Sequence, residues 1–174
     1  RDLHFRIEGP VVRQLQDAFV EDWASMTNEL LDGVKWYPDL SARGTTSARV
    51  ITDGPDADEG AINNVLMGAL SSARESVRIL TPYFLPDASM IAALGVTALR
   101  GVRVDIVLPA KGNVPFAQWA ATAQLWQVLR PGCRVWMTPP PFDHSKVFVI
   151  DRAWALVGST RICGIDRMLN RIAV

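Results

Sequence analysis

Residues 76–109, SVRILTPYFLPDASMIAALGVTALRGVRVDIVLP, decide the fold class of this protein. The stretches SVRILTPYF and VRVDIVLP at its two ends are short and largely apolar, which predicts two strands. The segment 87–101 between them is long enough for a helix, with Asp87 as its N-cap and Gly101 just past its end. A strand, a helix and a second strand in this order predict a right-handed crossover within a parallel sheet.

Strands and helices keep alternating on both sides of this stretch. One helix is predicted before it, from Glu59 to Arg74, and another after it, over 114–132. Then follow a strand over 133–138, a rigid proline-rich connection over 139–144, and two strands, 145–151 and 153–159, joined by a turn at Asp151-Arg152. This order predicts an α/β fold, an α-β-α sandwich. Its sheet is expected to be mixed and mostly parallel, covered by helices on both faces, and to end in an antiparallel hairpin.

The first third of the chain has weaker patterns. Apolar and polar side chains alternate at the start, with every second residue from Leu3 to Ile7 on one face, which is the period of a strand. Apolar residues then recur at four-residue steps after Gly9-Pro10, which is the period of a helix. The expected elements are a strand over 1–9, a helix from Pro10 to about Thr27, a loop over 32–47 and a short strand over 48–56.

The composition is that of one ordinary domain. Apolar residues make up 49% of the 174, enough for a sizeable core. The 18 Lys and Arg balance the 18 Asp and Glu, so the chain as a whole has no cationic field that favours duplex DNA or an anionic surface, which leaves room only for a local patch. No apolar run approaches the ~18 residues of a membrane span. Cys133 and Cys163 form no CxxC pair, which disfavours a zinc site of cysteine type and predicts two buried or half-buried thiols. No signal peptide opens the chain. Because it begins without Met and ends at Ala173-Val174 without a closing cap, we interpret it as a piece of a longer protein.

The candidate chemistry lies near the end of the predicted sheet. His144 and Lys146 are two residues apart on one strand and therefore project from the same face. If the last two strands form a hairpin, Gly158 and Ser159 return to the start of that strand, and the glycine lets a bound group approach the backbone. An imidazole, a fixed cation and a hydroxyl donor suit a phosphate group, with no cluster of metal ligands needed or visible.

The spacing of these residues is specific. The pattern resembles the HKD motif of the phospholipase D superfamily. It consists of His144-x-Lys146, then Asp151 after four residues, then Gly158-Ser159 after six more. The stretches DLHFRIEGPVVRQLQDAFVEDW, VRILTPYFLPD and PPPFDHSK further resemble the second half of a bacterial cardiolipin synthase. This resemblance covers nearly the whole chain up to Ser159 and implies a single phospholipase D-like domain over 1–174, the C-terminal half of an enzyme with two such motifs.

The resemblance also implies a reaction and a site. Such enzymes transfer a phosphatidyl group from one phosphatidylglycerol to another through a phosphohistidine intermediate, with one His as nucleophile and the other as general acid; the role of His144 stays open. Asp151 is included with the catalytic residues, although we expect it to support the turn more than to touch substrate. The implied catalytic residues are His144, Lys146 and Asp151, the phosphate-binding residues are Lys146, Gly158 and Ser159, and the residues of a pocket are Tyr83, Phe84 and Arg161.

No cofactor or metal is implied. The implied partners are phosphatidylglycerol, a membrane surface, and an N-terminal half with its own motif or a second copy of the chain, with no nucleic acid. The implied location is the bacterial cell membrane, on its cytoplasmic side or peripheral to it. A single His-x-Lys motif predicts little activity for the chain alone.

The chain departs from the family pattern after Thr160. Arg161 stands where the motif has Asn, and Ile172 stands where a Glu accepts a hydrogen bond from the catalytic imidazole. Two alternatives therefore stay open. The first is a non-catalytic, degenerate domain that keeps the fold and binds anionic head groups. The second is a phosphodiesterase or nuclease with one motif per chain that acts as a dimer.

Overall fold

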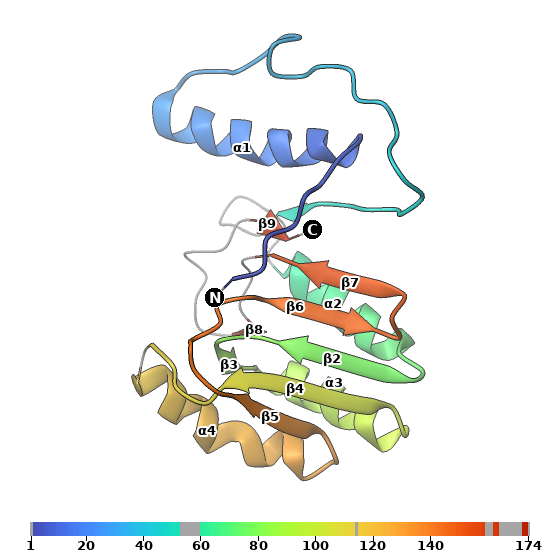
Figure 1. Ribbon diagram of the computed structural model, residues 1–174, viewed down its shortest axis with the longest axis vertical. Helices are drawn as coiled ribbons and strands as arrows, with labels where there is room; N and C mark the ends of the chain where they lie inside the picture. The colour runs from blue at the N-terminus through green and yellow to red at the C-terminus, as the bar shows by residue number, and fades with distance from the viewer. Residues whose placement is uncertain (1, 53–59, 114, 159–161, 164–171, 174) are drawn as a thin grey trace.

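A five-stranded sheet is the centre of the fold. The computed structural model describes residues 2–52, 60–113, 115–158, 162–163 and 172–173 (Figure 1). The strand order is β5 (Arg134–Thr138), β4 (Arg103–Pro109), β2 (Ser76–Leu80), β6 (Val147–Ile150) and β7 (Trp154–Val157). β2, β4 and β5 are parallel, whereas β6 is antiparallel to both of its neighbours. Only β6 therefore runs against the other strands of this sheet, which confirms the α/β class and the mixed, mostly parallel sheet.

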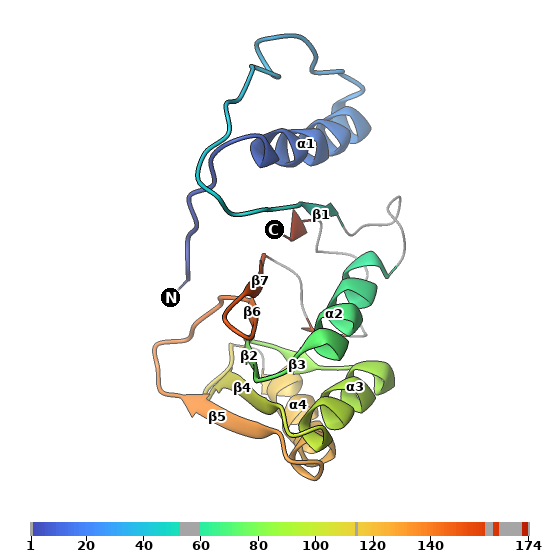
Figure 2. The same ribbon diagram turned by 90° about the vertical axis from the view of Figure 1, so that its right-hand side faces the viewer.

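Three helices pack on one face of this sheet. They are α2 (Ala61–Ser72), α3 (Ala88–Leu99) and α4 (Pro115–Leu129), and they lie side by side in Figure 2. Every second residue of β4 points at them, so Val104 and Ile106 are almost fully buried. Leu70, Leu94 and Val128 bury the matching helix faces and complete one apolar core. Asp87 caps α3 as predicted, because its carboxylate accepts a hydrogen bond from the Met90 amide at 2.8 Å.

The other face of the sheet differs from the prediction. No helix covers it within the described part of the chain (Figure 2). Charged and aromatic residues of β4 and β5 lie there: Asp105 accepts hydrogen bonds from Arg134 at 2.7 Å and from the Trp136 indole at 2.8 Å. These side chains keep the face polar and half-exposed, so it needs no second helical layer to shield it from water.

The N-terminal region is partly as expected. α1 (Val11–Thr27) matches the predicted helix, but residues 2–8 form no strand. They pair with no strand among the described residues, and Leu3 and Phe5 stay about half-exposed at 53% and 54%. The Leu3 amide instead donates a hydrogen bond to the Ser145 hydroxyl at 2.9 Å. A side-chain contact has therefore replaced the ladder that the alternating pattern predicts.

Two short strand pairs were not predicted. β1 (Ile51–Thr52) pairs antiparallel with β9 (Ile172–Ala173), and β3 (Phe84–Leu85) pairs parallel with β8 (Ile162–Cys163). The strand predicted over 76–84 is thus two strands, because Pro82 has no amide to donate to a ladder and the chain turns there.

Cys133 is buried in the core as predicted, and burial raises the pKa of its thiol to about 11. A thiol with so high a pKa is a weak nucleophile at neutral pH, which agrees with a packing role. The side chain of Cys163 lies outside the described residues.

Candidate active site

The candidate site lies where the parallel strands end. His144 and Lys146 immediately precede β6, whose first residue, Val147, pairs with Leu80, the last residue of β2. Because β6 runs antiparallel, its start lies at the carboxyl ends of β2 and β4. This is the edge at which open α/β sheets bind their ligands.

His144 and Lys146 contact each other directly. The Lys146 ammonium is 3.1 Å from Nδ1 and 3.2 Å from Nε2 of the imidazole, and it donates a hydrogen bond to the His144 carbonyl at 2.8 Å. Lys146 is 9% exposed, whereas the His144 side chain is 47% exposed. The pair that the spacing places on one face is therefore brought together, with a positive charge held beside an imidazole that solvent can reach.

Aromatic side chains surround the imidazole. Tyr83 lies edge-on to it with ring centroids 5.9 Å apart, and Phe142 lies 6.1 Å from it. The Tyr83 hydroxyl donates a hydrogen bond to the Asn113 side chain at 2.8 Å, which fixes the ring at the end of β2. Tyr83 is thus beside His144, as expected of a residue at the mouth of the site. Phe142 and Asn113 are site residues that no motif indicated.

The N-terminal segment supplies a carboxylate to the site. Oδ2 of Asp2 is 4.0 Å from Nδ1 of His144, an ion pair when the imidazole is protonated. Ser145 holds the segment in place, because its hydroxyl accepts from the Leu3 amide and lies 3.4 Å from Oδ1 of Asp2. Asp2 and His144 are 142 residues apart, so neither spacing nor periodicity could have indicated this contact.

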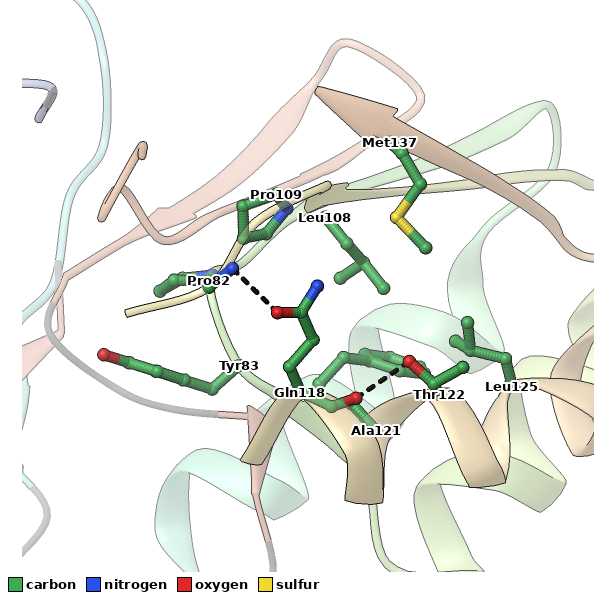
Figure 3. A pocket seen from close by; sticks show the side chains of 11 residues that line it. Pro82, Tyr83, Leu108, Pro109, Gln118, Ala121, Thr122, Leu125 and Met137 are labelled. Atoms are coloured by element: carbon green, nitrogen blue, oxygen red, sulfur yellow. Dashed lines mark hydrogen bonds between the residues drawn. The ribbon is translucent and has the colours of Figure 1, made fainter. Parts of the chain in front are cut away.

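Phe84 does not line the mouth of the site. It is 1% exposed and belongs to the core cluster. As the residue after Tyr83, it points to the opposite side of the chain from the Tyr83 ring. Its ring also forms part of the wall of a narrow apolar pocket beside Tyr83, between α4 and the ends of β4 and β5 (Figure 3). Phe84 therefore lines this cavity and not the space around His144.

The end of β7 returns to the site as the hairpin predicts. The Gly158 amide donates to the Lys146 carbonyl at 3.4 Å, so this glycine lies beside the start of β6. Ser159 and Arg161 lie outside the described residues, as does the side chain of Ile172. Within the described residues, no three His, Cys, Asp or Glu side chains gather where a metal could bind.

Asp151 lies at the opposite end of β6 from His144. At roughly 3.3 Å per residue the seven-residue separation is about 20 Å, too far for both to contact one phosphate. Its carboxylate accepts hydrogen bonds from the Arg74, Glu75 and Ser76 amides at 2.8, 2.8 and 2.7 Å. This residue of the motif thus fastens the turn after β6 to the connection between α2 and β2. That position agrees with the predicted support of the turn and gives it no place beside the imidazole.

We expect the Asp151→Ala variant to unfold at a temperature several degrees below the wild type, because three backbone amides lose their acceptor. The Ser76, Arg74 and Glu75 amides hold the pKa of Asp151 below its usual value of 3.8. The stability that this carboxylate contributes is therefore complete above about pH 5, and it is lost as the pH falls below 4 towards the lowered pKa. Thermal unfolding followed by circular dichroism between pH 2.5 and 6 measures both effects.

Asp39→Ala, which removes an exposed loop carboxylate, is the matched control. If Asp151→Ala loses stability with falling pH as steeply as the wild type does, Asp151 is not the group responsible.

The fold and this geometry define an α/β domain whose exposed imidazole and buried ammonium lie together at the carboxyl edge of the sheet. A family model described as "Cardiolipin synthase, PLD-like domain" matches residues 66–162, more than half of the chain. The chain therefore belongs to the cardiolipin synthase family of phospholipase D-like domains.

Relatives and solved structures agree with this membership. The major cardiolipin synthase ClsA of Bacillus subtilis is 35% identical over 164 residues, covering 93% of this chain and 34% of that protein. Cardiolipin synthase 2 of Staphylococcus epidermidis is 36% identical over 172 residues, covering 98% and 35%. This chain thus spans about a third of the length of these curated relatives.

Among solved structures, the phospholipase D family member Nuc from Salmonella typhimurium superposes with a TM-score of 0.58 at 24% identity, covering 71% of this chain and 79% of that one. Phosphatidylserine synthase from Haemophilus influenzae superposes with a TM-score of 0.55 at 13% identity, covering 98% and 42%. At these identities the structures establish the fold.

Proposed function

We propose that this chain is the C-terminal half, one domain over 1–174, of a phosphatidyltransferase of the cardiolipin synthase type. The observation that carries the proposal is the Lys146 ammonium 3.1 and 3.2 Å from the two ring nitrogens of the exposed His144 imidazole. A phosphate that reached this imidazole would meet a positive charge already in place. Such a preorganised charge stabilises the negative oxygens of a reacting phosphodiester.

The proposed reaction uses two imidazoles on one phosphorus. In the first step, one imidazole nitrogen attacks the phosphorus of a phosphatidylglycerol, and the bond from phosphorus to the terminal glycerol oxygen breaks. The second imidazole donates a proton to the leaving alkoxide. In the second step, a hydroxyl of another phosphatidylglycerol returns a proton to that imidazole and attacks the phosphorus, and the phosphorus–nitrogen bond breaks.

The side chains of this site have matching roles in the proposal. Lys146 neutralises the non-bridging oxygens, and Gly158 leaves the backbone open to them. Asp2 faces Nδ1 of His144 and stabilises the imidazolium that forms when the ring carries an extra proton. Although Ile172 stands where the family has a Glu, His144 still has a carboxylate nearby, that of Asp2. The second imidazole comes from an N-terminal half or from a second copy of the chain, since His4, the only other His, lacks a Lys two residues later.

The proposed substrate is an anionic phospholipid, so the proposal includes a membrane surface as partner and a location at the bacterial cell membrane, on its cytoplasmic side or peripheral to it. None of the described helices has the length and apolarity to cross a bilayer. Equal numbers of acidic and basic residues count against the nucleic-acid substrate of the nuclease alternative.

The Lys146→Met variant tests the phosphate site. It keeps the buried stem and removes the ammonium, so the fold should persist while binding of a water-soluble, short-chain phosphatidylglycerol weakens by at least tenfold, since a charge-assisted contact is worth about 1.5–3 kcal/mol. Isothermal titration measures the affinity, and Lys35→Met, at an exposed loop lysine, is the matched control. Equal affinities for Lys146→Met and the wild type would remove the basis of the proposal.

A further inference from the structure

Helix α4 exposes two large aromatic side chains to solvent. The seventeen residues from Asn113 to Leu129 include no charged side chain. Helices that border solvent ordinarily place charged residues on their outer face. Here that outer face instead carries Trp119 and Trp126, which are 74% and 60% exposed.

The exposed apolar residues of α4 form one continuous stripe. Trp119 and Trp126 are seven residues apart, two helical turns, and Leu129 follows three residues later on the same side. Val128 lies on the opposite side of the helix, and both Val128 and Leu125 are buried in the core. We call Trp119, Trp126 and Leu129 the tryptophan face.

Cations and a pocket border the tryptophan face. Lys111 precedes the helix and Arg130 follows it, and both are exposed, so a positive charge lies at each end of an uncharged surface. The apolar pocket beside Tyr83 is lined from α4 by Gln118 and Thr122 (Figure 3). Tyr83, which contacts the His144 ring, also lines this pocket, so the pocket borders both α4 and a residue beside the candidate active site.

We propose that the tryptophan face is the surface on which the chain lies against an anionic phospholipid bilayer, an inference that rests on the proposed lipid substrate. Tryptophan is the side chain most suited to the boundary between head groups and acyl chains, and the buried apolar area sets the strength of such binding. Cations at both ends of the face attract acidic head groups. A bilayer bound in this way lies against the helix that lines the pocket beside Tyr83.

The experiment measures binding of the 174-residue chain to vesicles of phosphatidylcholine and phosphatidylglycerol at a 7:3 ratio. The Trp119→Ala, Trp126→Ala double variant should bind at least tenfold more weakly, because most of the apolar contact area is removed. Lys111→Gln and Arg130→Gln should each weaken binding about fivefold on these vesicles and not on pure phosphatidylcholine. Trp136→Ala, at an exposed tryptophan of the uncovered sheet face, is the control and should bind as the wild type does.

Two outcomes would overturn the inference. In one, the double variant binds vesicles as tightly as the wild type. In the other, light scattering shows that the wild type is a dimer and the double variant a monomer, which makes this face a contact between copies.

A titration with short-chain phosphatidylglycerol separates this inference from the proposed function. That soluble lipid should bind the double variant normally and the Lys146→Met variant poorly. Normal binding by Lys146→Met would count against the phosphate site whatever the vesicles show.

Discussion

Joined to a matching N-terminal half, the His144→Ala variant should convert phosphatidylglycerol to cardiolipin about 10²–10⁴-fold more slowly than the unaltered protein. The imidazole of His144 is the only described one that solvent reaches beside a fixed ammonium, and either role proposed for it is lost with the ring. Product formation is measured by the glycerol released from phosphatidylglycerol vesicles. Binding of short-chain phosphatidylglycerol should change far less, because Lys146 remains.

His4→Ala is the matched control for this experiment. It removes the only other His, which is exposed and followed two residues later by Arg6 instead of Lys, and the rate should not change. If His144→Ala keeps the rate of the unaltered protein, the proposed chemistry is wrong. If the joined protein binds the lipid and never releases glycerol, the degenerate binding domain is the better description.

The Phe148→Ala variant should lose about 3–5 kcal/mol of the free energy of unfolding. Phe148 is in the middle of β6, is 2% exposed, and packs edge-on against Trp154 with ring centroids 6.2 Å apart. Removing the ring leaves a cavity between β6 and the helical layer that the surrounding side chains cannot fill. Urea unfolding followed by circular dichroism measures the loss.

Phe148→Leu is the conservative comparison and should lose much less, because it keeps most of the apolar volume. Phe19→Ala, at a ring of α1 that is largely exposed, should cost little. A loss for Phe148→Ala no larger than that for Phe19→Ala would mean that β6 is not held by this core.

Local patterns predicted most of the regular elements. Asp87 and Gly101 mark the ends of a helix that the structure places at Ala88–Leu99, and the hairpin turn falls at Asp151-Arg152. One failure, at the N-terminus, comes from contact between distant parts of the chain. Residues 2–8 have the alternation of a strand, yet the Leu3 amide donates to the Ser145 hydroxyl and the segment pairs with no strand among the described residues.

Only the part of the candidate site that lies on one strand and its hairpin neighbour could be predicted from the sequence. The His144–Lys146 pair and the return of Gly158 follow from the spacing of side chains along a hairpin. Asp2 could not be predicted, because its contact with the imidazole depends on where the whole N-terminal segment lies. Predicting the position of Asp151 would have required the direction of β6 within the sheet, which the spacing of the motif does not give.

Because β6 runs in this direction, its number of residues determines where Lys146 and Asp151 lie. Lys146 meets the imidazole at one edge of the sheet and Asp151 meets three amides at the other, with only Val147–Ile150 between them. One residue more or fewer would turn the side chains on one side of the change to the opposite face of the sheet. Either the ammonium would leave the imidazole or the carboxylate would leave the amides. The four-residue interval of the motif is thus set by the length of β6 from one end to the other. Insertions or deletions there are tolerated far less than substitutions.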